Sequence, residues 1–199
     1  MSSIFRKFQP QLVLAGALLA GLDPHTALAQ GSPQAPAAQA AASQDFDFFF
    51  GTWHVQNRRL AKPLQGSTQW ESFDGIQVCV PLLGGKANYD ELRTMANEPI
   101  GMSIHLFDQA RQTWSSTWVS VKDGLMQPPV SGTFKDGVGI FEGDDRHEGQ
   151  AIRVRYTWSR TNTPTPRWEQ AFSADGGKTW ETNWIMDYSR LPAASAGMQ

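Results

Sequence analysis

Short segments of alternating apolar and polar residues run along most of the chain, and turn signals separate them every 10 to 15 residues. Such alternation is typical of β-strands with one buried face. We expect strands at Thr52–Leu60, Ser67–Phe73, Val78–Leu83, Ile100–Phe107, Thr113–Val121, Leu125–Phe134, Val138–Gly143, Ala151–Arg160, Trp168–Ser173 and Thr179–Tyr188. Helical turns are expected only at Asp45–Phe50 and Asn88–Met95.

The later strands separate aromatic from charged side chains. In segments 151–160, 167–172 and 179–188, even-numbered positions are mostly aromatic or apolar and odd-numbered positions mostly charged or polar. A run of short antiparallel strands must hide its edges, and closure into a barrel does so most completely. We predict an all-β fold, an antiparallel up-and-down β-barrel of about 8–10 strands with the aromatic face inside. A β-sandwich is the alternative.

The first 29 residues predict export. Arg6 and Lys7 precede an apolar stretch of 11 residues, Leu12–Leu22, and Ala27-Leu28-Ala29 supplies the small residues of a cleavage site. The stretch is too short for a bilayer span, which needs about 20 apolar residues. We expect a signal peptide cleaved after Ala29 and a periplasmic or secreted protein. An uncleaved anchor is the alternative.

Composition divides the remainder of the chain. Residues 30–44 are almost wholly Ala, Gln, Pro and Ser, which predicts a flexible linker, and residues 192–199 predict a flexible tail. Residues 45–191 are left as one barrel domain. The 17 basic residues against 19 acidic ones give a net charge of -2, without a basic block, which argues against nucleic-acid binding.

Metal and cofactor chemistry has little support in the sequence. A single cysteine, Cys79, excludes an internal disulfide and a zinc site built from cysteines. His54, His105 and His147 lie on separate segments without metal-ligand spacing. We therefore expect no metal and no cofactor.

Eight tryptophans are more than a core of this size needs. A barrel of about this strand number holds either a packed core or one small ligand. Aromatic walls with a few polar groups, here Ser116 and Gln170, are typical of a small-molecule site. The residues expected to line that interior are Trp70, Trp118, Tyr156, Trp158, Trp168 and Trp184, together with Phe73 and Met102.

We therefore predict that the barrel binds a small hydrophobic or aromatic molecule. An aromatic ligand would stack on Trp118 or Trp184. Arg58, Asn88 and Glu91 are expected near the open end as polar anchors. A core filled by its own side chains, in a structural envelope module, is the alternative.

Acid–base catalysis is a second alternative. Arg155, Glu169 and Glu181 share the charged face of three strands, and Glu91 belongs to a polar cluster after Val78–Leu83. If they faced the interior, a glutamate could act as the base of a lyase, isomerase or hydrolase, with Arg155 stabilising charge. On the outer wall they would be cross-strand ion pairs, which the strand parity favours.

The segment Ser173–Trp180 resembles the Asp box of sialidase propellers. A propeller needs that motif on every blade, and the chain holds one copy. We predict that Asp175 caps a hairpin turn and takes no part in a binding site.

Two blocks of sequence resemble a known family. They are Asp45–Val55, which contains Gly51 and Trp53, and Trp168–Trp184. Both are similar to an uncharacterised bacterial family of unknown function placed with the calycins, the group that includes the lipocalins. The resemblance implies an antiparallel barrel able to take an apolar ligand, closed at one end by Gly51 and Trp53. It implies no established reaction.

Overall fold

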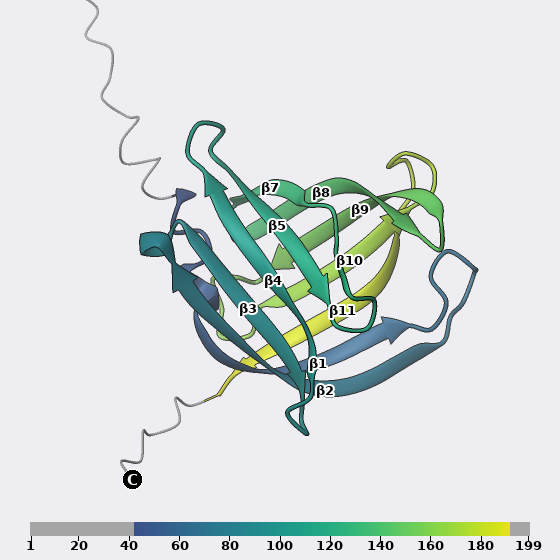
Figure 1. The fold of residues 1–199 in the computed structure, drawn as a ribbon, viewed down its shortest axis with the longest axis horizontal. Helices are drawn as coiled ribbons and strands as arrows, with labels where there is room; N and C mark the ends of the chain where they lie inside the picture. The colour runs from purple at the N-terminus through teal and green to yellow at the C-terminus, as the bar shows by residue number, and fades with distance from the viewer. Residues whose placement is uncertain (1–41, 192–199) are drawn as a thin grey trace, which may run out of the picture. The chain divides into compact units, whose positions relative to one another are not determined.

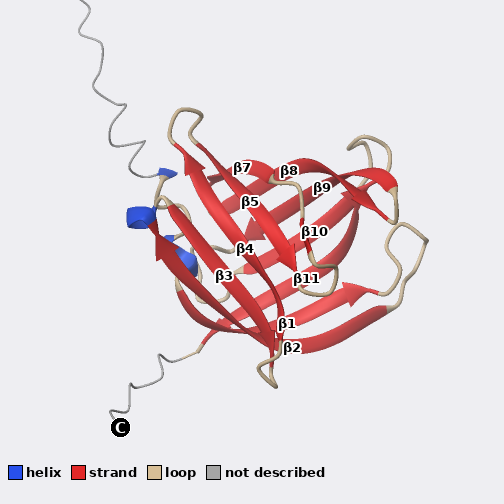
Figure 2. Ribbon diagram, in the orientation of Figure 1, coloured by secondary structure: helices blue, strands red, loops and turns tan. Residues whose placement is uncertain are grey.

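The computed structural model describes residues 42–191, which form strands and two short 3-10 helices. The predicted signal peptide, the C-terminal tail and most of the predicted linker lie outside these residues. The elements are η1 (Asp47–Phe49), β1 (Gly51–Leu60), β2 (Trp70–Leu82), η2 (Leu83–Gly85), β3 (Ala87–Thr94), β4 (Pro99–Asp108), β5 (Thr113–Ser120), β6 (Leu125–Met126), β7 (Val130–Lys135), β8 (Val138–His147), β9 (Gln150–Ser159), β10 (Arg167–Ser173) and β11 (Glu181–Arg190). Figure 2 shows how strongly strands dominate this part of the chain.

Ten of the strands close into an antiparallel barrel. Neighbouring strands pair in the order β4-β3-β2-β1-β11-β10-β9-β8-β7-β5, and the pairing of β4 with β5 completes the ring. The two residues of β6 add a short pairing to the end of β5. In Figure 1 β3, β4 and β5 cross in front of β9, β10 and β11. The predicted barrel is confirmed, and the sandwich alternative is wrong.

Four predicted segments differ from the observed strands. The segments Ser67–Phe73 and Val78–Leu83 merge into the single strand β2. Leu125–Phe134 is divided by Pro128 and Pro129, because proline cannot donate to a strand ladder. Asn88–Met95 belongs to a strand, β3, and not to a helical turn.

The misprediction of β3 has a physical cause. Its inward positions include Asn88 and Asp90, both almost completely buried. Polar residues on the inner face remove the apolar alternation from which strands are predicted. The missing pattern therefore coincides with a buried polar network inside the barrel.

Aromatic side chains from before β1 close one end of the barrel. Phe46 and Phe49 are fully buried, and Phe46 lies edge-on to Trp114, with ring centroids 4.9 Å apart. Phe49 likewise meets Trp158, at 4.7 Å. Edge-to-face pairs of this kind stabilise beyond the area they bury. The predicted turn at Asp45–Phe50 is thus a 3-10 helix that serves as a plug.

Gly51 and Trp53 fasten this plug to the wall. Trp53 donates from its indole Nε1 to the carbonyl of Phe49 at 2.7 Å, and the Arg190 guanidinium lies over the Trp53 ring, 3.7 Å from its centroid. Arg190 also donates to the carbonyls of Phe48 and Phe50. Gly51 has φ +110, and a Cβ there would lie 2.7 Å from the Arg190 guanidinium. Trp53 and Gly51 therefore close this end, as expected.

Replacing Trp53 by alanine tests the importance of the plug. Trp53 is 2 % exposed, and Trp53→Ala should lower the free energy of unfolding by about 3–5 kcal/mol. Trp70, which is 37 % exposed, is the matched control, and Trp70→Ala should cost less than about 1 kcal/mol. Equilibrium unfolding in urea measures both. Equal losses for the two variants would contradict the role given to Trp53.

Candidate functional site

The barrel interior has two levels of very different size. The deep level is a cavity of about 30 Å³ lined by Gln77, Asp90, Ser103, His105, Ser116, Trp118, Tyr156, Trp158, Trp168, Gln170, Trp184, Met186 and Tyr188. The level at the open end is a cavity of about 440 Å³. Small-molecule pockets measure about 300–1,000 Å³, whereas about 10–15 Å³ suffices for one water. The deep level fits water, and the mouth fits a ligand.

Trp184 forms the floor between the two levels. Its indole Nε1 donates to Asn57 Oδ1 at 3.0 Å, which fixes the plane of the ring. Trp118 and Trp168 meet it nearly at right angles, with ring centroids 5.8 and 5.4 Å away. The Arg59 guanidinium lies over one face of the Trp184 ring, 3.4 Å from its centroid. This floor is therefore held rigidly from several sides.

The position of Trp118 depends on a glycine in the neighbouring strand. A Cβ added to Gly101 of β4 would come within 2.3 Å of the Trp118 ring. The missing side chain lets the indole lie against the backbone of β4 while it lines both the deep cavity and the mouth.

The deep level is built around the buried carboxylate of Asp90. Gln77 Nε2 donates to Asp90 Oδ1, and His105 Nε2 lies 2.9 Å from Asp90 Oδ2. Tyr188 in turn donates its hydroxyl to Gln77 Oε1 at 3.0 Å. A buried carboxylate is tolerated because these donors replace water.

Two buried polar atoms of this level have no hydrogen-bond partner among residues 42–191. They are His105 Nδ1 and Asn88 Nδ2. His105 lines the deep cavity. A water molecule there would provide a polar partner of the right size for an unpaired ring nitrogen.

Charged residues from the loops at the open end form the mouth. The mouth cavity is lined by Arg59, Leu60, Ala61, Lys62, Pro63, Gln65, Glu71, Trp118, Lys122, Asp123, Gln127, Asp145, Arg146, His147, Glu148, Tyr156, Gln170, Phe172, Asn183 and Trp184. A second cavity of about 690 Å³ shares Arg59, Trp118 and the segment 145–148, and extends over Leu125 and Met126. The mouth thus has an aromatic floor and a rim with charges of both signs.

Most of the predicted aromatic residues lie where they were expected. Trp118, Tyr156, Trp158, Trp168 and Trp184 all line the interior. Trp70 does not, because it lies at the exposed start of β2. Met102 was also expected inside the barrel, but its neighbours Gly101 and Ser103 are the inward residues of β4, so Met102 faces outward.

The predicted polar anchors lie elsewhere in the structure. Arg58 is exposed on the outer face of β1, and Glu91 pairs with Arg93 outside the barrel, with 2.7 Å between Arg93 Nη2 and Glu91 Oε1. Asn88 is buried next to Cys79, away from the open end. The expectation that these three surround the open end is wrong. The parity of Trp53 and Val55, both buried, would have indicated Asn57 and Arg59 as the inward residues of β1.

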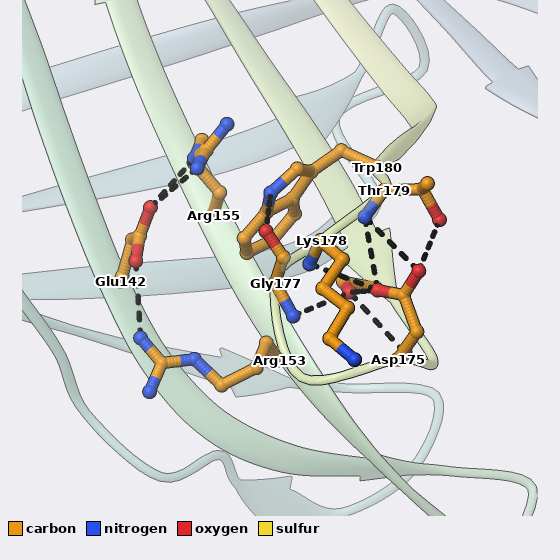
Figure 3. Close-up of polar contacts among 9 residues, drawn as sticks. Glu142, Arg153, Arg155, Asp175, Gly177, Lys178, Thr179 and Trp180 are labelled. Carbon is orange, nitrogen blue, oxygen red and sulfur yellow. Dashed lines mark hydrogen bonds and ion pairs between the residues drawn. The ribbon is translucent and has the colours of Figure 1, made fainter.

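Arg155 and Glu169 lie on the outer wall, whereas Glu181 is paired with Phe172, which lines the mouth. Glu142 binds both Arg153 and Arg155, at 3.0 and 2.7 Å, and Arg155 stacks on Trp180 (Figure 3). Glu169 alternates along β10 with Trp168 and Gln170, which face the interior, so the Glu169 side chain faces outward. Glu181 accepts a hydrogen bond from the Leu64 backbone N–H at 2.5 Å. Arg155, Glu169 and Glu181 therefore do not meet inside the barrel, and the cross-strand ion pair that Arg155 forms is with Glu142.

The Asp box forms the predicted hairpin turn. Asp175 accepts the backbone N–H groups of Lys178 and Thr179 and the hydroxyls of Ser173 and Thr179 (Figure 3). These hydrogen bonds, those of Thr179 first, lower the pKa of Asp175. All its acceptors are used within the turn, so Asp175 has a structural role.

Burial changes the acidity of three side chains in the interior. Desolvation raises the pKa of the Tyr156 phenol, with the nearby Asp145 adding to the effect. It raises the pKa of Tyr188 well above its usual value, and Asp90 adds to that shift. The pKa of the Cys79 thiol is also raised by burial, so the thiol stays protonated at neutral pH.

Among residues 42–191, no three His, Cys, Asp or Glu side chains are grouped so that they could hold a metal ion. The same residues contain no helix with the length and apolar character of a membrane span.

Comparisons with known proteins support the fold. No family model matches the chain, and no curated protein matches its sequence. The structure of Rv2717c from M. tuberculosis is similar, with 12% identity and a TM-score of 0.50 over 76% of this chain and 98% of that one. The S-type phycobiliprotein lyase CPES from Guillardia theta is 12% identical, with a TM-score of 0.49 over 81% and 99%. The similarity to Rv2717c supports the antiparallel barrel fold of this chain.

The raised pKa values of the Tyr156 and Tyr188 phenols predict that the protein loses stability at high pH. A phenol whose pKa is raised in the folded state stabilises that state fully below its ordinary pKa, about 10, and the contribution is lost as the pH rises above it. The chain has three tyrosines, and Tyr89→Phe leaves only Tyr156 and Tyr188 to titrate. In this variant the free energy of unfolding should fall from pH 10 upwards. Adding Tyr156→Phe should make the fall shallower. Urea unfolding at several pH values measures this. Tyrosine absorbance that titrates near pH 10 in the folded protein would contradict it.

Proposed function

We propose that the protein binds one small hydrophobic or aromatic molecule in the mouth of the barrel. The observation that carries this proposal is the difference between the two interior levels. The mouth, at about 440 Å³, has the size of a small-molecule pocket, and the deep level, at about 30 Å³, does not. The aromatic floor of the mouth supplies the apolar contact.

The available aromatic surface determines where the ligand lies. One face of Trp184 is already covered by Arg59, and its edges meet Trp118 and Trp168. The ligand therefore packs against Trp118, Tyr156 and Phe172 around this floor. An aromatic pair contributes about 0.5–1.5 kcal/mol beyond the area it buries.

Binding is favoured over acid–base catalysis at this site. The catalytic alternative needs Arg155 and a carboxylate in the cavity, and Arg155 is committed to Glu142 on the outer wall. Glu91 is paired with Arg93. The acidic residues that do border the mouth, such as Asp123 and Asp145, have no histidine or arginine ion-paired to them among the described residues.

We further propose that the protein is exported and belongs to the uncharacterised calycin-like family that its two sequence blocks resemble. The support is the apolar stretch Leu12–Leu22 followed by Ala27-Leu28-Ala29. N-terminal sequencing of the protein recovered outside the cytoplasm should begin at Gln30. Recovery of a chain that still begins at Met1 would contradict cleavage.

Titration with N-phenylnaphthylamine, a neutral aromatic probe that fluoresces in apolar surroundings, tests the binding proposal. The full chain should bind it saturably with one site. Trp118→Leu removes an aromatic wall of the mouth and should weaken binding by several-fold, corresponding to about 1 kcal/mol. Trp70→Leu removes an exposed tryptophan that lines neither cavity, and should leave the affinity unchanged.

Native mass spectrometry of the exported protein complements the titration. A mass that disappears on denaturation would identify a captured natural ligand. Absence of saturable probe binding, or equal effects of the Trp118 and Trp70 substitutions, would overturn the proposal.

A further inference from the structure

Arg59 brings a positive charge into the mouth without a direct ion-pair partner among the described residues. Its guanidinium rests on Trp184 and makes no hydrogen bond or ion pair with any residue of the described range 42–191. Burial lowers the pKa of Arg59 to about 10, and the charge of Asp123 acts against that shift. The side chain is thus still a cation at neutral pH, in a site that is partly removed from water.

The other half-buried arginines of the barrel all have carboxylate partners. Arg93 pairs with Glu91, Arg153 and Arg155 with Glu142, and Arg167 with Asp187. A charge removed from water is ordinarily paired. Arg59 departs from this pattern at the mouth, where the cavity is large enough for a ligand.

Of the four acidic side chains that line the mouth cavity, Glu71 lies opposite Arg59 on β2 without an ion pair to it, and the other three have hydrogen-bond partners of their own. Asp123, whose negative charge raises the pKa of Arg59, accepts a hydrogen bond from the Ser120 hydroxyl at 2.7 Å. Asp145 accepts the backbone N–H of Arg146, and Glu148 accepts the Gln65 side-chain amide. Burial raises the pKa of the Asp145 carboxyl, which lowers its tendency to carry a negative charge in the cavity.

We propose that Arg59 is an anion-recognition residue, and that the ligand of the mouth is an aromatic or apolar molecule that carries an acidic group. This inference rests on the proposed function and names the chemical class of its ligand. Trp184 holds the guanidinium plane from one side, so the N–H groups at its edge point in fixed directions. A carboxylate or sulfonate accepts two parallel hydrogen bonds from such an edge.

Stacking also explains why an arginine is needed. A planar guanidinium lies flat on an indole, and the Phe73 ring lies 5.9 Å from the Arg59 guanidinium as well, so a ligand would meet the edge of the guanidinium. A lysine would keep the charge but lose the plane and the paired donors. The mouth therefore favours a flat anion over both an aliphatic cation and a neutral molecule of the same shape.

Two probes of the same shape separate the two contributions. Anilinonaphthalene sulfonate carries an acidic group, and N-phenylnaphthylamine is its neutral counterpart. The full chain should bind the sulfonate about tenfold or more tightly than the neutral probe, the ratio expected for a charge-assisted hydrogen bond. Arg59→Gln should abolish this preference while leaving the neutral probe bound, and Arg59→Lys should retain part of it.

Arg58→Gln is the matched control. Arg58 is the preceding residue of β1 and lies exposed on the outer face, so its removal changes the net charge equally without touching the mouth. The preference for the sulfonate should survive in this variant. Equal loss in both variants would reduce the effect to general electrostatics and overturn the inference.

The remaining outcomes distinguish this inference from the proposed function. If both probes bind with the same affinity and Arg59→Gln changes neither, the cavity binds ligands but Arg59 does not recognise an anion. If neither probe binds to the folded chain, the proposed function itself fails.

Discussion

The pairing of β4 with β5 makes the interior of this protein a closed space. The pairing runs along eight residues, whereas β5 meets β7 along only three. Once the ring is complete, inward side chains have to share a fixed volume, and large aromatic groups fill it from the closed end upward. Phe46, Phe49 and Trp53 occupy the first layer, and Trp184 ends the filled part. The mouth is the volume that this filling leaves.

The same constraint separates structural from functional polarity. Asp90 is deep, and its neighbours satisfy it with hydrogen bonds, so it specifies how β2, β3, β4 and β11 meet. Arg59 is shallow, and within residues 42–191 its guanidinium contacts aromatic rings but forms no hydrogen bond or ion pair. The other half-buried arginines have carboxylate partners, and the partner that we propose for Arg59 is the acidic group of a ligand. Polarity in the floor of the mouth is therefore more informative about function than polarity at the base.

Sequence pattern predicted the barrel and its aromatic face because both follow from a repeat of two residues. Trp118, Tyr156 and Trp184 lie inside for that reason. The pattern failed at β3, where polar side chains take inward positions, and it gave no warning that Asp90, Gln77 and Tyr188 form one network. Contacts between residues so distant in the chain depend on the order of strands in the ring. The inward position of Arg59 could have been predicted from the sequence, since the alternation along β1 places Arg59 and Arg58 on opposite faces.

One irregularity in the wall has an evolutionary consequence. The pairing of β10 with β11 shifts between Gln170 and Ala171, so Asn183 is an extra residue and is buried beside Trp184. In a regular strand, one added residue would turn every later side chain to the opposite face. A bulge absorbs such an insertion locally. An insertion in the mouth half of these strands can thus change the side chains that a ligand meets, while the packing of the half below Trp184 is retained.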